Sequence, residues 1–209
     1  MTERFPVMGK WPLETYVPFE IESTIKKKFD HPDHLNEALK NAVIIHKQKH
    51  HKHVFLFGGY HEKRDFYATS EHFGTDELRN IHLGIDVWSE PGTPIFSPEE
   101  GVVHSIKYNA APQDYGWCLI IQYQGYFLLY GHLAEKTNSL VKVGDIVKKG
   151  QMIGLLGDLS ENGGWEPHLH LQKIIDIGQW WGDYPGVCSE KDLSFYQTNC
   201  PSPIEFILA

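Results

Sequence analysis

The sequence has few cysteines and no long apolar run. Its 209 residues contain three cysteines, Cys118, Cys188 and Cys200. An odd number at such wide spacing suits neither a disulfide framework nor a cysteine zinc site. No run approaches the ~18 apolar residues that a membrane span requires. Charged residues and Pro6 interrupt the start, where a secretory signal would have its apolar stretch. These absences predict a cytoplasmic protein without a membrane partner.

The chain also lacks an excess of basic residues. It has 19 Lys and Arg against 27 Asp and Glu, which gives a formal net charge of −8. A nucleic-acid surface needs a basic face to neutralise phosphates, so we expect no nucleic-acid partner. Hydrophobic residues make up 41% and aromatic residues 13%, which indicates a globular chain. The length is ample for one core with additions.

Three short runs do contain the residue types of a catalytic metal site: residues 82–86 (His-Leu-Gly-Ile-Asp), 130–133 (Tyr-Gly-His-Leu) and 168–170 (His-Leu-His). If the first and last runs are strands, their polar side chains share one face and their apolar side chains the other. Two imidazoles two residues apart then stand about 7 Å from each other. That separation suits one metal ligand and one group working beside the metal.

The chemistry of hydrolysis calls for such a division. A catalytic zinc takes three protein ligands and leaves a fourth position for water. The metal lowers the pKa of that water to about 7, and a nearby base relays its proton. Neutral imidazoles and carboxylates are suitable ligands, and the three runs together supply four histidines and one aspartate. Spacing alone does not select which of them bind.

The order of the runs resembles the lysostaphin-type zinc endopeptidases. That family has a His-x-x-x-Asp run, a Tyr-x-His-Leu run and a His-x-His run in this order, and every such position is occupied here. The segment 143–154 is also typical of the family, so the resemblance covers roughly residues 80–175. The segments 162–165 and 182–187 are similar to a cytoplasmic-looking branch of the family, and that wider match runs from about residue 58 to 187.

The resemblance implies a role for each polar residue. His82, Asp86 and His170 would bind one Zn²⁺ per chain, His168 would be the general base, and His132 would orient water or stabilise the oxyanion. It also implies a mainly β, antiparallel metallopeptidase fold of the duplicated hybrid motif type, with a groove across one sheet. The expected activity is zinc-dependent hydrolysis of a peptide-like substrate; the usual family substrates are bacterial cell-wall peptides. No sequence feature selects one peptide or sets the oligomeric state.

Two other functions compete with the hydrolase. The run 82–86 also resembles the active histidine segment of glucose-permease IIA domains, which predicts a phosphocarrier. That alternative leaves the run 168–170 unexplained. The second alternative is a zinc-binding module without catalysis, whose groove would be closed by residues 60–80 or 108–116.

Around this centre we expect three parts: an N-terminal extension with one helix (residues 1–75), the catalytic domain (76–178), and a C-terminal tail packing on it (179–209). Residues 31–53 show a helical apolar stripe. Within that helix, His46 and His50 are four residues apart and are either a metal pair or a solvated helix end, the latter being commoner.

Smaller predictions concern the strands and the groove. Residues 95–97 and 101–106 are expected to pair with each other, and residues 119–123 with 126–130 as a hairpin across Gln124-Gly125. Tyr67 and His72 are candidates to line the groove from a loop. Trp165 is equally suited to a substrate wall and to the core.

Overall fold

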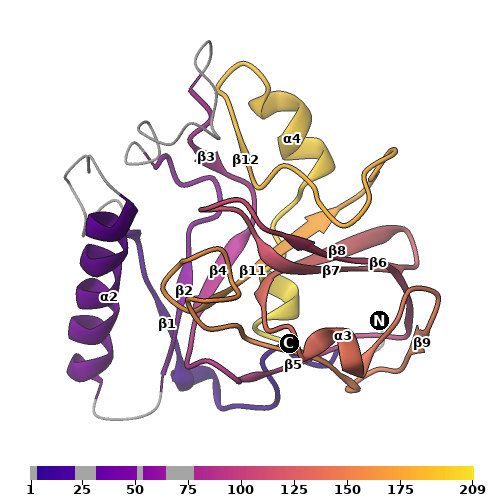
Figure 1. Cartoon of the computed structure of the whole chain (residues 1–209), viewed down its shortest axis with the longest axis horizontal. Helices are drawn as coiled ribbons and strands as arrows, with labels where there is room; N and C mark the ends of the chain where they lie inside the picture. Colours follow the sequence, from indigo (N-terminus) through magenta and orange to yellow (C-terminus); the bar gives the residue numbers. More distant parts are fainter. Residues whose placement is uncertain (1–3, 22–31, 51–53, 65–77) are drawn as a thin grey trace.

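One eight-stranded sheet organises the molecule (Figure 1). The computed structural model describes residues 4–21, 32–50, 54–64 and 78–209. From edge to edge the strands are β1 (Tyr16–Pro18), β2 (Phe55–Gly58), β4 (Ile85–Trp88), β11 (His168–Ile174), β8 (Tyr126–Leu133), β7 (Gly116–Tyr123), β6 (Gly101–Asn109) and β9 (Ile146–Val147). Strands β1 and β2 are parallel, and all other neighbours are antiparallel. The predicted mainly β, antiparallel fold is therefore confirmed.

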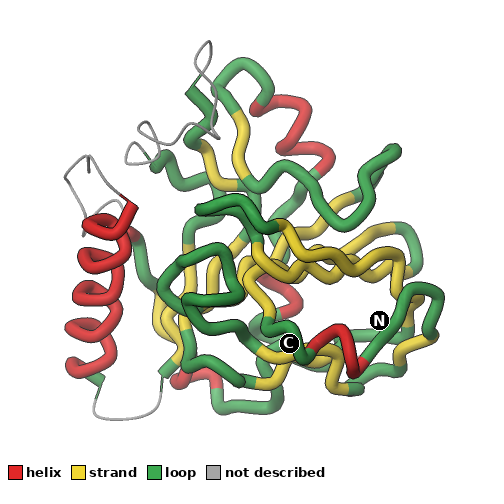
Figure 2. The backbone as a smooth tube through the Cα atoms, viewed as in Figure 1, coloured by secondary structure: helices red, strands yellow, loops and turns green. Residues whose placement is uncertain are grey.

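Two small sheets and short helices complete the described chain (Figure 2). The small sheets pair β10 (Met152–Leu155) with β5 (Pro94–Phe96) and β12 (Val187–Cys188) with β3 (Ile81–His82). The helices are α2 (Pro32–Lys49), α3 (Thr137–Leu140) and α4 (Leu193–Asn199), with 3₁₀ turns η1 (Leu13–Thr15) and η4 (Ile204–Phe206). Among the described helices, none is long and apolar enough to cross a membrane.

The central strands are buried on both faces. In β8, Leu128 and Tyr130 enter one apolar cluster and Leu129 enters another, as the alternation of side chains along a strand requires. In β7, Leu119 and Ile120 divide between the same two clusters. The hairpin β7–β8 turns at Gln124-Gly125 as predicted, with Tyr123 opposite Tyr126. It ends at the segment that carries His132.

Two strand predictions are wrong. Residues 82–86 are not one strand, because β3 ends at His82 and β4 begins at Ile85, and the two strands join different sheets. Residues 95–97 do not pair with 101–106, since β5 pairs with β10 while β6 pairs with β7 and β9. In both cases a partner distant in sequence determines the pairing, and local alternation carries no information about that partner.

Helix α2 covers one edge of the sheet (Figure 1). Its buried Leu39, Ala42 and Val43 share an apolar cluster with Leu56 of β2 and Trp88 of β4. The predicted helix over 31–53 is thus confirmed over Pro32–Lys49, while residues 51–53 lie outside the described part. This packing places α2 beside the strand that carries Asp86.

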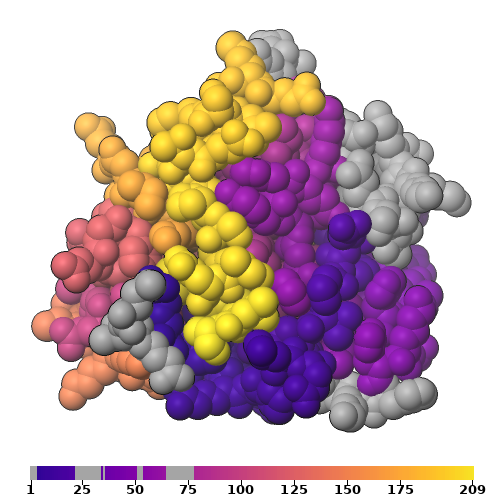
Figure 3. Space-filling model, turned by 180° about the vertical axis from the view of Figure 1, so that it is seen from behind, coloured from indigo at the N-terminus to yellow at the C-terminus, as the bar shows by residue number. Residues whose placement is uncertain are grey.

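The two ends of the chain lie together on the far side of the molecule (Figure 3). The Val7 backbone N–H donates to the carbonyl of Phe206 at 2.9 Å, and Arg4 pairs with Glu205. Strands β1 and β2 of the expected extension hydrogen-bond into the main sheet, and β12 of the expected tail pairs with β3. The boundaries at residues 75 and 178 stay a prediction.

Candidate metal and catalytic site

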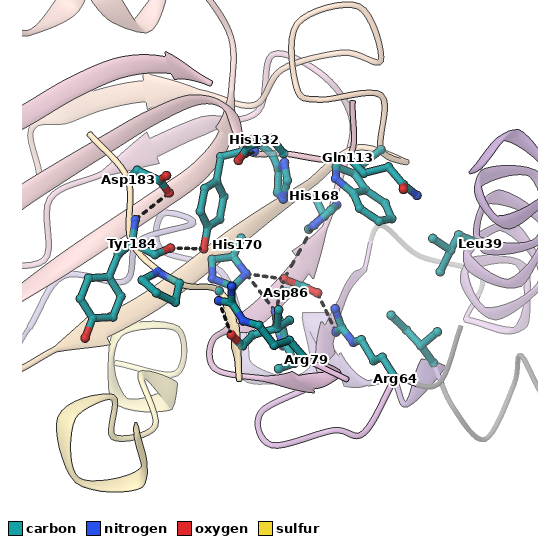
Figure 4. A pocket seen from close by; sticks show the side chains of 18 of the residues that line it. Leu39, Arg64, Arg79, Asp86, Gln113, His132, His168, His170, Asp183 and Tyr184 are labelled. Carbon is teal, nitrogen blue, oxygen red and sulfur yellow. Dashed lines mark hydrogen bonds and ion pairs between the residues drawn. The ribbon is translucent and has the colours of Figure 1, made fainter. Parts of the chain in front are cut away.

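Three potential metal ligands converge at one face of the main sheet. Asp86 of β4 lies directly opposite His170 of β11, and β3 brings His82 to the same point. His82 Nε2 and His170 Nδ1 are 2.9 Å apart, and they lie 3.3 and 3.2 Å from Asp86 Oδ1. The three side chains are almost entirely buried. The structure thus brings together the three residues predicted to bind metal. Figure 4 labels two of them, Asp86 and His170.

Hydrogen bonds on the outer side determine which histidine nitrogens face inward. His82 Nδ1 lies 2.9 Å from the carbonyl oxygen of Gly59, and His170 Nε2 lies 2.9 Å from Oε1 of Gln172. These oxygens only accept, so each outer nitrogen carries the proton and donates. The inner nitrogens are left with lone pairs, and Asp86 Oδ1 is also an acceptor. No proton therefore lies between these three acceptor atoms, and their lone pairs face one another.

A zinc ion fits this donor set. Ligands about 2.0–2.1 Å from a tetrahedral zinc lie about 3.3 Å from one another, close to the observed separations. Two imidazoles and one carboxylate are ligands that zinc accepts, and the outer hydrogen bonds are those that usually support such ligands. The cation would relieve the repulsion among the three lone pairs.

Gly84 makes room for this arrangement. A Cβ atom at residue 84 would lie 2.6 Å from Cε1 of His170 and 2.7 Å from the Leu171 carbonyl oxygen. Real side chains do not approach that closely, so only glycine lets the His170 ring lie against the β3–β4 connection.

A buried arginine holds the other oxygen of the aspartate. Arg64 donates from Nη2 to Asp86 Oδ2 at 2.7 Å and from Nε to Glu62 Oε2 at 3.0 Å. Its side chain is 3% exposed. This bond occupies Oδ2 and leaves Oδ1 to face His82 and His170. Arg64 therefore orients the carboxylate and balances its charge.

The two predicted catalytic histidines lie together above Asp86 (Figure 4). The rings of His132 and His168 are 4.3 Å apart between centroids, and His168 Nε2 lies 3.7 Å from Asp86 Oδ1. His168 Nδ1 donates to the carbonyl of Glu166 at 2.7 Å, and His132 Nδ1 donates to that of Asn162 at 2.8 Å. Both Nε2 atoms are thereby left as proton acceptors.

His132 occupies a strained backbone position. Its φ of 62° lies in the left-handed region, which costs a non-glycine residue about 1–3 kcal/mol. The residue is the last but one of β8, and its N–H donates to the Tyr115 carbonyl at 2.9 Å. Surrounding hydrogen bonds therefore hold a conformation that aims the ring at His168.

Burial and neighbouring charges determine the protonation states. Burial lowers the pKa of His82 to about 4, and the positive Arg64 adds to the effect. Burial also lowers the pKa of His132 well below its usual value, and that of His168 as well. For Asp86, burial acts to raise the pKa, but His82 and Arg64 outweigh it and hold the pKa well below its usual value. The site therefore combines neutral imidazoles at His82, His132 and His168 with an ionised carboxylate at Asp86.

A cavity of about 250 Å³ lies over these residues. Its walls are largely aromatic and apolar, with two arginines and two further acids: Ile21, Leu39, Arg64, Arg79, Trp88, Asp114, Tyr115, Trp165, Trp180, Asp183, Tyr184 and Val187. Trp165 packs in the α2 cluster and also lines the cavity, so the core expectation is met and a role as a substrate wall stays a prediction. Tyr67 and His72 lie outside the described residues.

The second histidine pair forms no comparable site. His46 donates from Nδ1 to the Ala42 carbonyl at 3.1 Å and packs against Phe19, while His50 is exposed. Among the described residues, the group of three or more possible metal ligands is His82, Asp86 and His170 alone. The solvated-helix-end interpretation of residues 46–50 fits these contacts.

Three supporting residues were not predicted from the sequence: Arg64, Asn162 and Gln172. Gln172 shares the face of β11 with His168 and His170, so the alternation that placed the histidines was a usable signal. Asn162 sits in the turn before the last run, where its Oδ1 accepts from the N–H of Gly164 and Trp165. No sequence pattern indicates Arg64, because its partner Asp86 comes within hydrogen-bond distance only in the folded chain.

Comparison with protein families agrees with this geometry. Residues 80–178 match the model of peptidase family M23. The matched stretch contains all five predicted site residues.

Known proteins with similar sequences include a peptidoglycan DD-endopeptidase and lysostaphin. The chain is 34% identical over 118 residues to peptidoglycan DD-endopeptidase ShyC of Vibrio cholerae, covering 54% of this chain and 26% of ShyC. It is 33% identical over 100 residues to lysostaphin of Staphylococcus staphylolyticus, covering 46% of this chain and 19% of lysostaphin. The chain thus spans about a quarter or less of the length of these relatives.

Solved structures give similar matches. A zinc-containing peptidase from Vibrio cholerae aligns with a TM-score of 0.37 and 33% identity, over 45% of this chain and 27% of that one. The catalytic domain of lysostaphin from Staphylococcus simulans aligns with a TM-score of 0.40 and 22% identity, over 60% and 86%.

Proposed function

We propose that the protein is a zinc-dependent metallopeptidase that hydrolyses a peptide or related amide bond with metal-activated water. The observation that carries the proposal is the convergence of three lone-pair atoms: Asp86 Oδ1 and the inner nitrogens of His82 and His170, whose ring protons lie on their outer nitrogens. Two further histidines stand beside them in a cavity. One zinc per chain would be bound.

The roles of the chain's own groups follow from their hydrogen bonds. A bound zinc would supply Lewis-acid polarisation of the carbonyl and lower the pKa of a water molecule. His168 Nε2 is positioned to accept the proton of the attacking water and return it to the leaving amine. His132 Nε2, also an acceptor, orients that water. Arg64 keeps Asp86 ionised and in position.

The substrate class is proposed from the relatives and the cavity. ShyC is named a peptidoglycan DD-endopeptidase, so a peptide of cell-wall type is the first class to examine. The negative net charge argues against a nucleic-acid substrate. A cytoplasmic location remains our proposal, supported by three buried free cysteines, since such thiols persist in reducing compartments.

The alternatives of phosphocarrier and idle module have less support. His82 Nε2 faces two other acceptors, His170 Nδ1 at 2.9 Å and Asp86 Oδ1 at 3.3 Å, and these would repel the oxygens of an incoming phosphoryl group. An idle module leaves unexplained the strained His132 and the cavity above the histidines.

The test uses metal content and cleavage together. Zinc is measured by elemental analysis, and cleavage of a pool of N-acetylated tetrapeptides is followed by mass spectrometry. We expect His168→Ala to keep its zinc and lose activity about 10²–10⁴-fold, as for removal of a general base. Zinc binding without cleavage by the wild type would favour the idle module. Full activity in His168→Ala would refute the assigned base.

A further inference from the structure

The three arginines of the chain differ in their partners. Arg4 pairs with Glu99 at 2.7 Å and with Glu205 at 3.2 Å. Arg64 pairs with Glu62 and Asp86. Arg79 forms no ion pair with any carboxylate of the described residues; its Nη2 donates to the Val187 carbonyl at 3.0 Å. One guanidinium is thus held in place by a backbone carbonyl, with no carboxylate of the described residues at ion-pair distance.

The position of Arg79 relates it directly to the metal site. Val187, which accepts its hydrogen bond, is paired in register with the proposed metal ligand His82. Paired residues in an antiparallel ladder have Cα atoms about 4.5–5.5 Å apart. Arg79 and the site histidines also line the same cavity. The guanidinium therefore lies beside the proposed metal position, on the wall made by β12.

The remaining charges define where an anion would bind. Asp86 is compensated by Arg64, and the other acids of the wall are Asp114 and Asp183. Asp183 and Leu39 lie at opposite sides of the cavity, with Arg79 between them (Figure 4). The Leu39 side is apolar, with Ile21, Trp88 and Trp165. Among the described lining residues, Arg79 is thus the cation left to receive an anion.

We propose that Arg79 binds a carboxylate of the substrate, located one or two residues beyond the scissile amide. This proposal rests on the proposed hydrolase function and gives it a substrate class: short peptides with a free carboxyl group near the cleaved bond. An extended chain spans about 3.3–3.6 Å per residue, so a terminal carboxylate would reach the β12 wall while its amide lies over the metal site. A planar guanidinium suits two-oxygen recognition of a carboxylate.

The experiment compares two pools of N-acetylated tetrapeptides, one with a free C-terminal carboxylate and one with a C-terminal amide. Zinc-loaded wild type, Arg79→Gln and the control Arg4→Gln are assayed for cleavage by mass spectrometry. Arg4 is a matched control because it does not line the cavity and its loss removes the same charge. In parallel, the Nε–H signals of the arginines are followed by ¹H–¹⁵N NMR in zinc-loaded His168→Ala, where turnover is suppressed.

We expect the wild type to cleave the acid pool about 10- to 100-fold faster than the amide pool, from the strength of a hydrogen bond to a charged group. Arg79→Gln should lose this preference and keep its rate on amides, and Arg4→Gln should retain both rates. The acid pool alone should shift the Arg79 signal.

Other outcomes separate the two proposals. Equal cleavage of both pools by the wild type would overturn the role of Arg79 and leave the hydrolase intact. A faster cleavage of the acid pool that persists in Arg79→Gln would also overturn the role of Arg79 and leave the hydrolase intact. If neither pool is cleaved, the hydrolase proposal fails for these substrates and the NMR result decides: an acid-specific shift of Arg79 supports a carboxylate site, and no shift refutes it.

Discussion

Two pairs of possible metal ligands in this chain share the same four-residue spacing. His82 and Asp86 lie in a buried site, while His46 and His50 lie at the end of α2. The first pair meets His170 from 84 residues further along, with outer protons held by Gly59 and Gln172. Among the described residues the second pair meets no third potential ligand, and His50 is exposed to solvent. The two pairs thus have the same spacing in the sequence. The buried pair differs because a third ligand meets it and because hydrogen bonds fix which nitrogen of each histidine carries the proton.

The largest effect should come from removing the third ligand. His170→Ala should reduce zinc content from about one per chain to less than about 0.1, because a two-ligand site binds zinc weakly. His50→Ala should retain the full zinc content. Elemental analysis of both purified variants makes the comparison. Equal zinc loss from His50→Ala would show that the helix end is part of the metal site.

A smaller effect is expected from the supporting hydrogen bond. Gln172→Met keeps the volume but removes the acceptor for His170 Nε2–H, so zinc affinity should fall about 10–100-fold. Competition with a zinc chelator measures this change. Gln122→Met is the matched control, since Gln122 lies exposed on β7. An unchanged affinity in Gln172→Met would show that the outer hydrogen bond does not orient the ligand.

The smallest effect concerns the helix end. His46→Ala removes the contact with Phe19 and a hydrogen bond to Ala42, and should lower the free energy of unfolding by about 1 kcal/mol. Urea denaturation, analysed with one m value for the variant and the wild type, measures this free energy of unfolding. For His50→Ala the free energy of unfolding should stay within about 0.5 kcal/mol of the wild type. Zinc content should not change in either variant. A zinc loss in His46→Ala would contradict its purely structural role.

The same contrast explains what could be predicted from the sequence. Alternation and turn signals placed the β7–β8 hairpin and the inward faces of His168 and His170, because both are local properties. The break at Leu83-Gly84 was missed, since it arises from β3 pairing with β12 while β4 pairs with β11. Arg64 was missed for the same reason, because its partner Asp86 lies 22 residues further along the chain and is brought to it by the fold. Contacts between segments that are distant in the sequence produce no periodic pattern of residues from which they could be predicted.

Strand order has a consequence for how the protein is made. In the sheet, β11 lies between β4 and β8, although it comes after both in the chain. During synthesis, β4 and β8 emerge with a gap between them that only the later β11 can fill. Closing so long a loop is slow, and the exposed edges of β4 and β8 are open to wrong pairing until it closes. The proposed metal site can therefore assemble only after residue 170 has left the ribosome, and a chain truncated before that point would keep two of its three proposed ligands, His82 and Asp86.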